Sequence, residues 1–232
     1  MKHFIYIITT LVIVLFAQTA VFSSSKNTTL DQHESIVSTD SLLQMYQEME
    51  LSQVINFEVF SNAMEGHGKL PIPNKDIITL IDFSKPSSEK RMCVVHIKEK
   101  KVLYTSYVSH GKKSGDKYAK WFSNKVGSHK SSLGFYVTEN TYNGRNGYSL
   151  VLNGLEKGFN SNAKQRAIVV HGADYCDPKE LESSDRLGRS FGCPAIPQSL
   201  TRPIIDTIKE GTLLFVYAND QQYLKRSPIL AR

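Results

Sequence analysis

Short β-branched and aromatic segments, spaced closely along most of the chain, constrain its fold more than any other feature. Seven such segments stand between clusters of turn-forming residues, at positions 76–83, 91–100, 101–110, 131–139, 148–155, 166–172 and 212–219. Segments of this length and composition are typical of β-strands, and the first three are close enough to form two consecutive hairpins. The pattern predicts a mainly β fold, a sandwich or barrel of about seven or more strands.

Two other stretches carry helical periodicity. In the first, Ser41 and Gln44 fit a capping box, and apolar residues follow at helical spacing from Leu42 to Met64. The second, residues 199–211, has an early proline, isoleucines on one face and a glycine at its end. We expect an N-terminal helical region packed on the core and a short helix near the end of the chain.

The first residues resemble a secretory signal. One lysine precedes an apolar run from Phe4 to about Ala17, and small residues follow near Ser23, which predicts a signal peptide over residues 1–23. The run is short for a stable membrane span, with an uncleaved anchor as the alternative. Residues 24–40 are polar and predict a flexible tether, and residues 41–232 then form one exported domain, periplasmic or at the cell envelope.

The chain is basic, with 28 lysines and arginines, 22 acidic side chains and a formal net charge of +6. A basic exported protein is attracted to anionic wall polymers or membrane surfaces, and export argues against nucleic acid as a partner. The histidines and acidic residues show neither HExxH nor CxxC spacing, so we expect no metal and no cofactor. The oligomeric state stays open.

Three cysteines cannot all pair within one exported molecule, so at least one thiol is left over. Cys93 lies in an apolar segment typical of a buried strand, where it packs as a small hydrophobic residue. Cys193 follows a glycine in RLGRSFGCPAIP and is either a nucleophile or the disulfide partner of Cys176. A disulfide between Cys176 and Cys93 is a further alternative.

A histidine is placed to activate Cys193. The apolar strand RAIVVHG delivers His171 at its exit, beside Gly172, and reactive side chains are commonly held at such strand ends. A thiol with its ordinary pKa of about 8.5 is a poor nucleophile at neutral pH and needs a neighbouring base. Imidazole takes that proton and can return it to a leaving amine, which favours a catalytic pair of His171 and Cys193.

The stretch HGADYC…GRSFGCPA resembles the signature of the murein L,D-transpeptidase catalytic domain family, the YkuD-like proteins. The matching positions are the histidine His171, the hydroxyl residue Ser190, the glycine Gly192 and the nucleophile Cys193. The resemblance extends over roughly residues 50–220. It implies a YkuD-like β-sandwich with a short helix after the catalytic cysteine.

The sequence departs from this signature at Phe191, Ala195 and Gly172, where some members have a hydroxyl residue, and in a slightly longer interval from His171 to Ser190. Phe191 replaces a second histidine, as in a divergent branch of the family with an aromatic residue there, and Ala195 replaces an arginine that many members carry. His171 is then the base by itself.

The resemblance implies an acyl transfer on peptidoglycan. Cys193, activated by His171, would attack the third residue of a stem peptide, release D-alanine and form a thioester. The backbone N–H groups of Gly192 and Cys193 would stabilise the oxyanion. An amine of a neighbouring stem would complete a 3-3 cross-link, whereas water would make the enzyme an L,D-carboxypeptidase. Carbapenems, which typically acylate this family, would target Cys193.

Other residues near the motif are candidates for contacts with the substrate. Ser190 either orients the substrate or His171, or is a turn serine that bonds its own backbone. Arg189 suits the carboxylates of stem peptides and is favoured over Arg186, and His110 follows a strand and is a candidate for the same cleft.

Three further side chains fit structural positions better. His129 fits a loop position, and Trp121 and Phe122 either line the cleft or cap the core, with the core preferred.

Two other functions share this fold class. One is an endopeptidase or amidase that uses the same thiol, and the other is a non-catalytic cell-envelope binding protein. A disulfide between Cys176 and Cys193 would favour the binding protein because it would block the nucleophile.

Overall fold

The computed structural model describes residues 38–231. The expected signal peptide over residues 1–23 and all but the last three residues of the expected tether, 24–40, lie outside this range and stay predictions. Within residues 38–231, no helix is long and apolar enough to cross a membrane.

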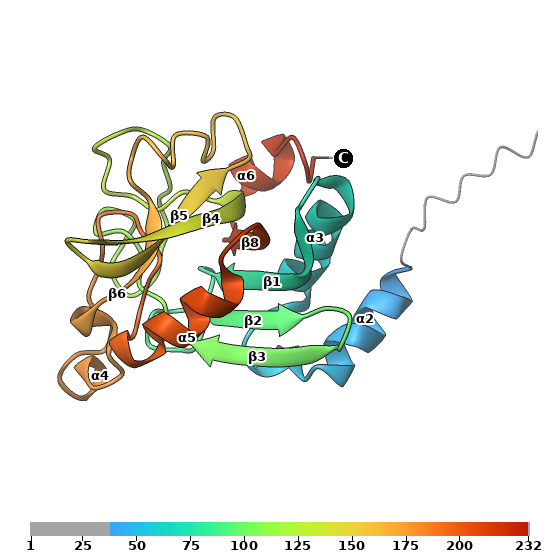
Figure 1. The fold of residues 1–232 in the computed structure, drawn as a ribbon, viewed down its shortest axis with the longest axis horizontal. Helices are drawn as coiled ribbons and strands as arrows, with labels where there is room; N and C mark the ends of the chain where they lie inside the picture. The colour runs from blue at the N-terminus through green and yellow to red at the C-terminus, as the bar shows by residue number, and fades with distance from the viewer. Residues whose placement is uncertain (1–37, 232) are drawn as a thin grey trace, which may run out of the picture. The chain divides into compact units, whose positions relative to one another are not determined.

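Eight strands are hydrogen-bonded into one sheet, in the order β3-β2-β1-β8-β4-β5-β6-β7 (Figure 1). The strands are β1 (Asn74–Asp82), β2 (Met92–His96), β3 (Lys101–Ser106), β4 (Gly134–Gly144), β5 (Gly147–Gly154), β6 (Val169–Gly172), β7 (Ala195–Ile196) and β8 (Thr212–Tyr217). Each of the seven predicted segments overlaps one of them, and the mainly β fold is confirmed. The strand that sequence patterns did not indicate is β7, which is two residues long.

The sheet curls until its two edges are joined. β1, β2 and β3 pair antiparallel, as the two predicted hairpins require. Beyond β3 the chain then reaches the opposite edge, where Ser109 pairs with Ala195 of β7 and Gly111 pairs with Ser190. The sheet is therefore nearly closed, like a barrel, and the long loop over residues 107–133 lies against the segment that carries Cys193.

The described helices are α2 (Thr39–Glu48), α3 (Phe57–Lys69), α4 (Glu180–Ser183), α5 (Gln198–Ile208) and α6 (Gln221–Arg226). α3 and α5 pack on strands of the sheet, α2 packs on α3, and α4 has no buried residue. β8 lies between β1 and β4 and is buried along its whole length, which fits its continuous apolar sequence. Figure 1 shows α4 and β6 at the end of the molecule opposite α2 and α3.

Both predicted helical regions are confirmed, but the first begins earlier than the capping pattern indicates. The N-cap of α2 is Ser38, whose hydroxyl accepts a hydrogen bond from the Ser41 N–H at 3.2 Å. Ser41 is thus a residue of the first turn, and the cap predicted there was wrong by three positions.

Candidate active site

His171 is a buried imidazole on strand β6. It lies on β6 between Ser149 of β5 and Ala195 of β7, and its side chain is buried. Its Nδ1 is 2.8 Å from the Gly172 carbonyl, and because a carbonyl only accepts, Nδ1 carries the proton and donates. Burial lowers the pKa of His171 and outweighs the hydrogen bond to Gly172, which raises it. Nε2 therefore keeps its lone pair and is free to accept a proton.

Cys193 stands on the turn just before β7, partly buried. Its Sγ donates to the Ala167 carbonyl at 3.5 Å. Burial raises the pKa of Cys193, while the Val169 N–H and the Arg166 guanidinium act in the opposite direction. The group at rest is a thiol, which needs a base to become a nucleophile, and the surrounding donors are placed to stabilise the thiolate once it forms.

All three cysteines of the chain lie in the described range and are free thiols. Cys93 is fully buried on β2, as its sequence context predicts. Cys176 is also fully buried, and its Sγ donates to the Ala195 carbonyl at 3.1 Å. Burial raises the pKa of Cys176 to about 11, so this thiol stays protonated near neutral pH, and neither disulfide alternative is present.

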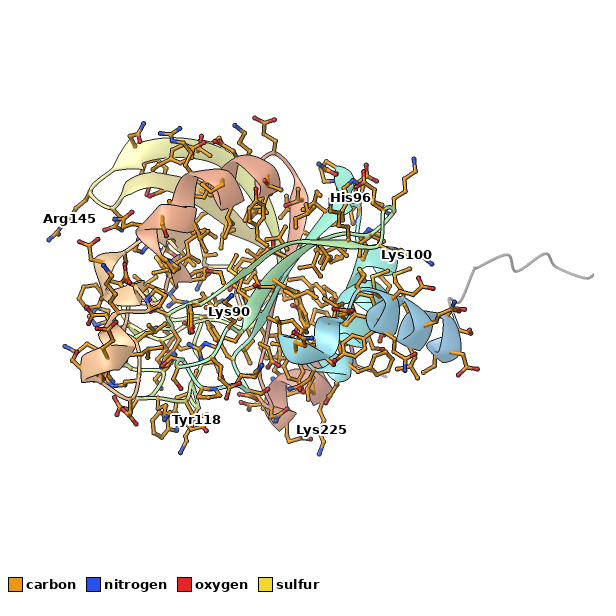
Figure 2. The ribbon with its side chains drawn as sticks, turned by 90° about the horizontal axis from the view of Figure 1, so that it is seen from below. Lys90, His96, Lys100, Tyr118, Arg145 and Lys225 are labelled. Atoms are coloured by element: carbon orange, nitrogen blue, oxygen red, sulfur yellow. The ribbon has the colours of Figure 1, made fainter. Side chains whose placement is uncertain are left out.

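His171 and Cys193 line the same cavity, which has a volume of about 610 Å³. One wall is the tip of the β4–β5 hairpin, where Arg145 projects from the molecule (Figure 2). Tyr175 and Gln198 line other walls, from the segment after β6 and from the start of α5. A cavity of this size holds a ligand the size of a short peptide and brings it to the thiol and the imidazole together.

Ser190 holds the cysteine turn in shape. Its hydroxyl donates to the Cys193 carbonyl at 2.6 Å and accepts from the Gly192 N–H at 3.0 Å. It is therefore a turn serine, which the sequence left as an alternative, although it also lines the cavity. The Gly192 N–H already donates to the Ser190 hydroxyl, so it is not free to donate to an oxyanion as the sequence led us to expect.

Glycine is required at position 192. The backbone there has a φ of 130°, and a Cβ would lie 2.9 Å from the Lys130 carbonyl oxygen and 3.0 Å from Arg166 Nη2. Any side chain would strain the turn and collide with the neighbouring loop.

Replacing Ser190 with alanine should destabilise the protein through this turn. The substitution leaves the Gly192 N–H and the Cys193 carbonyl without their partner, and we expect the free energy of unfolding to fall by about 1–3 kcal/mol. Urea denaturation measures the change, with Ser199→Ala as a matched control because Ser199 is exposed on α5. Equal stability of the two variants would show that the turn does not depend on the hydroxyl.

Arg189 lies in the cavity wall and Arg186 does not. Arg189 donates to the Gly115 carbonyl at 2.9 Å and pairs with Asp116 at 3.1 Å, while Arg186 pairs with the same carboxylate at 2.7 Å. This placement agrees with the prediction that Arg189, rather than Arg186, lies beside the site.

His110 was expected in the cleft, and the structure places it in the core instead. Its side chain is fully buried, and its Nδ1 accepts a hydrogen bond from Arg91 Nη2 at 2.9 Å. Burial, followed by the charge of Arg91, lowers the pKa of His110 to about 3, so the ring stays neutral. It does not line the cavity of His171 and Cys193, and its burial keeps it from contact with a ligand there.

Aromatic residues near the site divide between surface and core. Trp121 is 57% exposed, so the preference for a core position was wrong for it. Phe122 stacks on Phe83 with ring centroids 6.5 Å apart and does pack on the core. His129, expected in a loop, lies in one and packs its ring on exposed Phe191 at 4.6 Å between centroids.

Sequence reasoning missed Arg166, which precedes β6. Its guanidinium donates to the carbonyls of Ser123 and Lys130 and to the hydroxyls of Ser128 and Ser132. All four acceptors are neutral, and within residues 38–231 no carboxylate pairs with it. The only sequence signal was a charged residue at the start of an otherwise apolar strand.

The charge of Arg166 acts on the nucleophile. Its Nη2 lies against the Gly192 backbone, and the guanidinium lowers the pKa of Cys193. The next residue, Ala167, has a left-handed backbone with a φ of 51° and accepts the hydrogen bond from the thiol. An uncompensated cation beside a cysteine favours the thiolate, so Arg166 is part of the site.

One protein family matches most of the chain. The profile of the L,D-transpeptidase catalytic domain family matches residues 51–217. A comparison with curated proteins returned no match.

Similar solved structures include an L,D-transpeptidase from Mycobacterium smegmatis (13% identity, TM-score 0.39, 62% of this chain and 59% of that one). Others are an L,D-transpeptidase from Xylanimonas cellulosilytica (13%, 0.35, 77% and 93%) and the helical cell shape determining protein of Campylobacter jejuni (13%, 0.40, 79% and 56%). The chain spans between 49% and 59% of the length of the first three structures found. Because the family profile covers most of the chain, the protein belongs to the L,D-transpeptidase catalytic domain family.

Proposed function

We propose that this protein is a cysteine-dependent L,D-transpeptidase that acts on peptidoglycan stem peptides. The observation that carries the proposal is one cavity lined by a thiol, Cys193, and by a neutral imidazole, His171, whose Nδ1 proton is held by a carbonyl. We also propose that the domain is exported and works at the cell envelope, on the basis of the N-terminal sequence.

The first half of the reaction forms a thioester. Nε2 of His171 takes the thiol proton, and Sγ of Cys193 bonds to the carbonyl carbon of the third stem residue. As the tetrahedral intermediate collapses, the C–N bond to the terminal D-alanine breaks and the imidazolium returns the proton to the leaving amine. The Cys193 N–H, which lies beside its own Sγ, is the oxyanion donor in this proposal.

The second half transfers the acyl group. An amine of a neighbouring stem loses a proton to His171 and attacks the thioester, and Sγ leaves and regains that proton. The product is a 3-3 cross-link, and water in place of the amine gives L,D-carboxypeptidase activity. The free thiol of Cys193 argues against the alternative of a binding protein whose nucleophile is blocked by Cys176.

Incubation of the purified protein with a carbapenem, followed by intact-protein mass spectrometry, tests the proposal. We expect one covalent adduct that maps to Cys193, and we expect release of D-alanine from a tetrapeptide stem. Under reducing conditions, absence of both the adduct and D-alanine would refute a transpeptidase and favour the envelope-binding protein. Products cut at a bond other than that to D-alanine would instead indicate an endopeptidase or amidase.

Arg166→Met should raise the pKa of the Cys193 thiol, because it removes the guanidinium whose charge lowers that pKa. We expect acylation at neutral pH to slow by about tenfold for each unit of that rise. The pH dependence of cysteine alkylation measures the pKa. Arg166→Lys is the control, since it keeps the charge and loses the forked hydrogen bonds. A purely structural role would leave the alkylation profile of Arg166→Met unchanged.

A further inference from the structure

A second cavity adjoins the catalytic one and has no role in the steps above. Its volume is about 580 Å³, and it is lined by Lys112, Lys113, Asp116, Trp121, Lys130 and Arg189, together with Gly115. Neither His171 nor Cys193 lines it, so any ligand there is held without being attacked. Arg189 lines both cavities and is the wall between them.

The second cavity is strongly cationic. Four of its lining residues are basic and one, Asp116, is acidic, and the Asp116 carboxylate is already paired with Arg186 and Arg189. Lys112, Lys113 and Lys130 pair with no carboxylate within residues 38–231. Three lysines that have no described carboxylate partner line this one surface hollow, and such a concentration of positive charge attracts a ligand that carries several carboxylates.

Trp121 supplies an apolar face in the same cavity. Its side chain is 57% exposed, although it follows a segment whose backbone is well anchored. The N–H groups of Lys120 and Trp121 both donate to the Ser114 carbonyl, at 2.7 and 2.9 Å. An indole held in this way loses little conformational entropy when a ligand covers it, which favours binding.

The loop that carries these lysines is tied directly to the cysteine turn. The Lys112 N–H donates to the Ser190 carbonyl at 2.7 Å, and the Lys130 carbonyl lies against Gly192. The Gly111 N–H and the Ser131 hydroxyl are hydrogen-bonded at 3.0 Å, which joins the two ends of the loop. A ligand in the second cavity is therefore held at a fixed position relative to Cys193.

We propose that this cationic cavity binds the acceptor, a second stem peptide recognised by its carboxylates. The inference rests on the proposed function, in which two stems must meet at one thioester. The donor occupies the cavity of His171 and Cys193. The acceptor lies across Arg189, with its carboxylates near Lys112, Lys113 and Lys130 and an apolar part on Trp121, so that its amine reaches the acyl carbon.

The chain provides its own reporter for binding, because Trp121 is the only tryptophan in the sequence. A tripeptide stem with free carboxylates is titrated into Cys193→Ala protein, which cannot turn over, while tryptophan fluorescence is recorded. We expect a saturable change, and about tenfold weaker binding in Lys112→Gln/Lys113→Gln and at raised salt. The same tripeptide with its carboxylates converted to amides should bind about tenfold more weakly as well. No fluorescence change, or equal affinity for both tripeptides, would overturn the proposal.

Lys90→Gln/Lys225→Gln is the matched control. Both lysines are exposed, pair with no described carboxylate and do not line the second cavity. This variant also removes two positive charges, so it separates a local site from the effect of net charge. Equal weakening in both double variants would show that the cavity is not the binding site.

Measurements of turnover show whether the second cavity binds the acceptor or the donor. In protein with Cys193 intact, Lys112→Gln/Lys113→Gln should be acylated by a carbapenem at the wild-type rate. Its ratio of cross-linked to hydrolysed product should fall about tenfold and recover at high acceptor concentration. Slower acylation would assign the cavity to the donor and overturn the proposal. If the wild-type protein is not acylated at all, the proposed function fails, while the fluorescence titration still decides whether the cavity binds carboxylates.

Discussion

Cys193→Ala should abolish both the carbapenem adduct and the release of D-alanine, with a loss of at least about 10⁴-fold in rate. In the proposed reaction the thioester forms on Sγ of Cys193, and the thiols of Cys93 and Cys176 are buried away from solvent. Intact-protein mass spectrometry and a D-alanine assay measure the two effects.

The controls for this prediction are Cys93→Ala and Cys176→Ala. Burial raises the pKa of both thiols, so neither is a nucleophile near neutral pH, and we expect both variants to be labelled normally. Loss of a buried side chain lowers stability, so labelling of the variants and of the wild-type protein should be compared well below each variant's unfolding temperature. An adduct that survives in Cys193→Ala, or moves to another residue, would contradict the assignment of the nucleophile.

His171→Ala should slow acylation by about 10²–10⁴-fold, because the thiol of Cys193 then has no general base. The pH dependence of the acylation rate tests whether this loss comes from the imidazole of His171. Burial lowers the pKa of His171, so the imidazole of the wild-type protein stays neutral to a lower pH than ordinary histidine. The wild-type rate should therefore hold steady at neutral pH and fall only below about pH 6.5, the ordinary value for histidine.

In His171→Ala the profile should change shape. The fall at acidic pH that reports imidazole protonation disappears, and the rate rises about tenfold per pH unit toward the pKa of the thiol. Because burial raises the pKa of Cys193, that rise continues beyond the ordinary range of cysteine. Stopped-flow measurement of acylation across pH provides both profiles. Identical shapes for the two proteins would exclude His171 as the base.

Local sequence patterns were sufficient for most of the strands. The segments around β1, β2, β5 and β8 are rich in apolar and β-branched residues. A buried strand needs such side chains whatever its position in the sheet, so these strands can be predicted from local sequence. The pattern did not reveal β7, because two residues show no periodicity. The early start of α2 was missed because a serine fits the cap at position 38 as well as at position 41.

The candidate pair of His171 and Cys193 could also be predicted from the sequence, but the charged residues around the pair could not. His171 and Cys193 stand at the exit of an apolar strand and in a glycine turn, and both positions are visible along the chain. His110, which we expected in the site, is buried beside Arg91. Arg166, which the sequence patterns did not single out, lies against the turn that carries Cys193. Charge and burial at a single position depend on neighbours that are distant in the chain.

The sequence by itself determined the mainly β fold and indicated Cys193 and His171 as the candidate nucleophile and base, because each leaves a local pattern of side chains. Only the tertiary structure decided which cations face that site and that a second cavity adjoins the first. Closure of the sheet brings the loop over residues 107–133 onto the cysteine turn, through the pairing of Ser109 with Ala195. Contacts between segments so far apart depend on how the whole sheet curls, and no short stretch of sequence encodes that curvature.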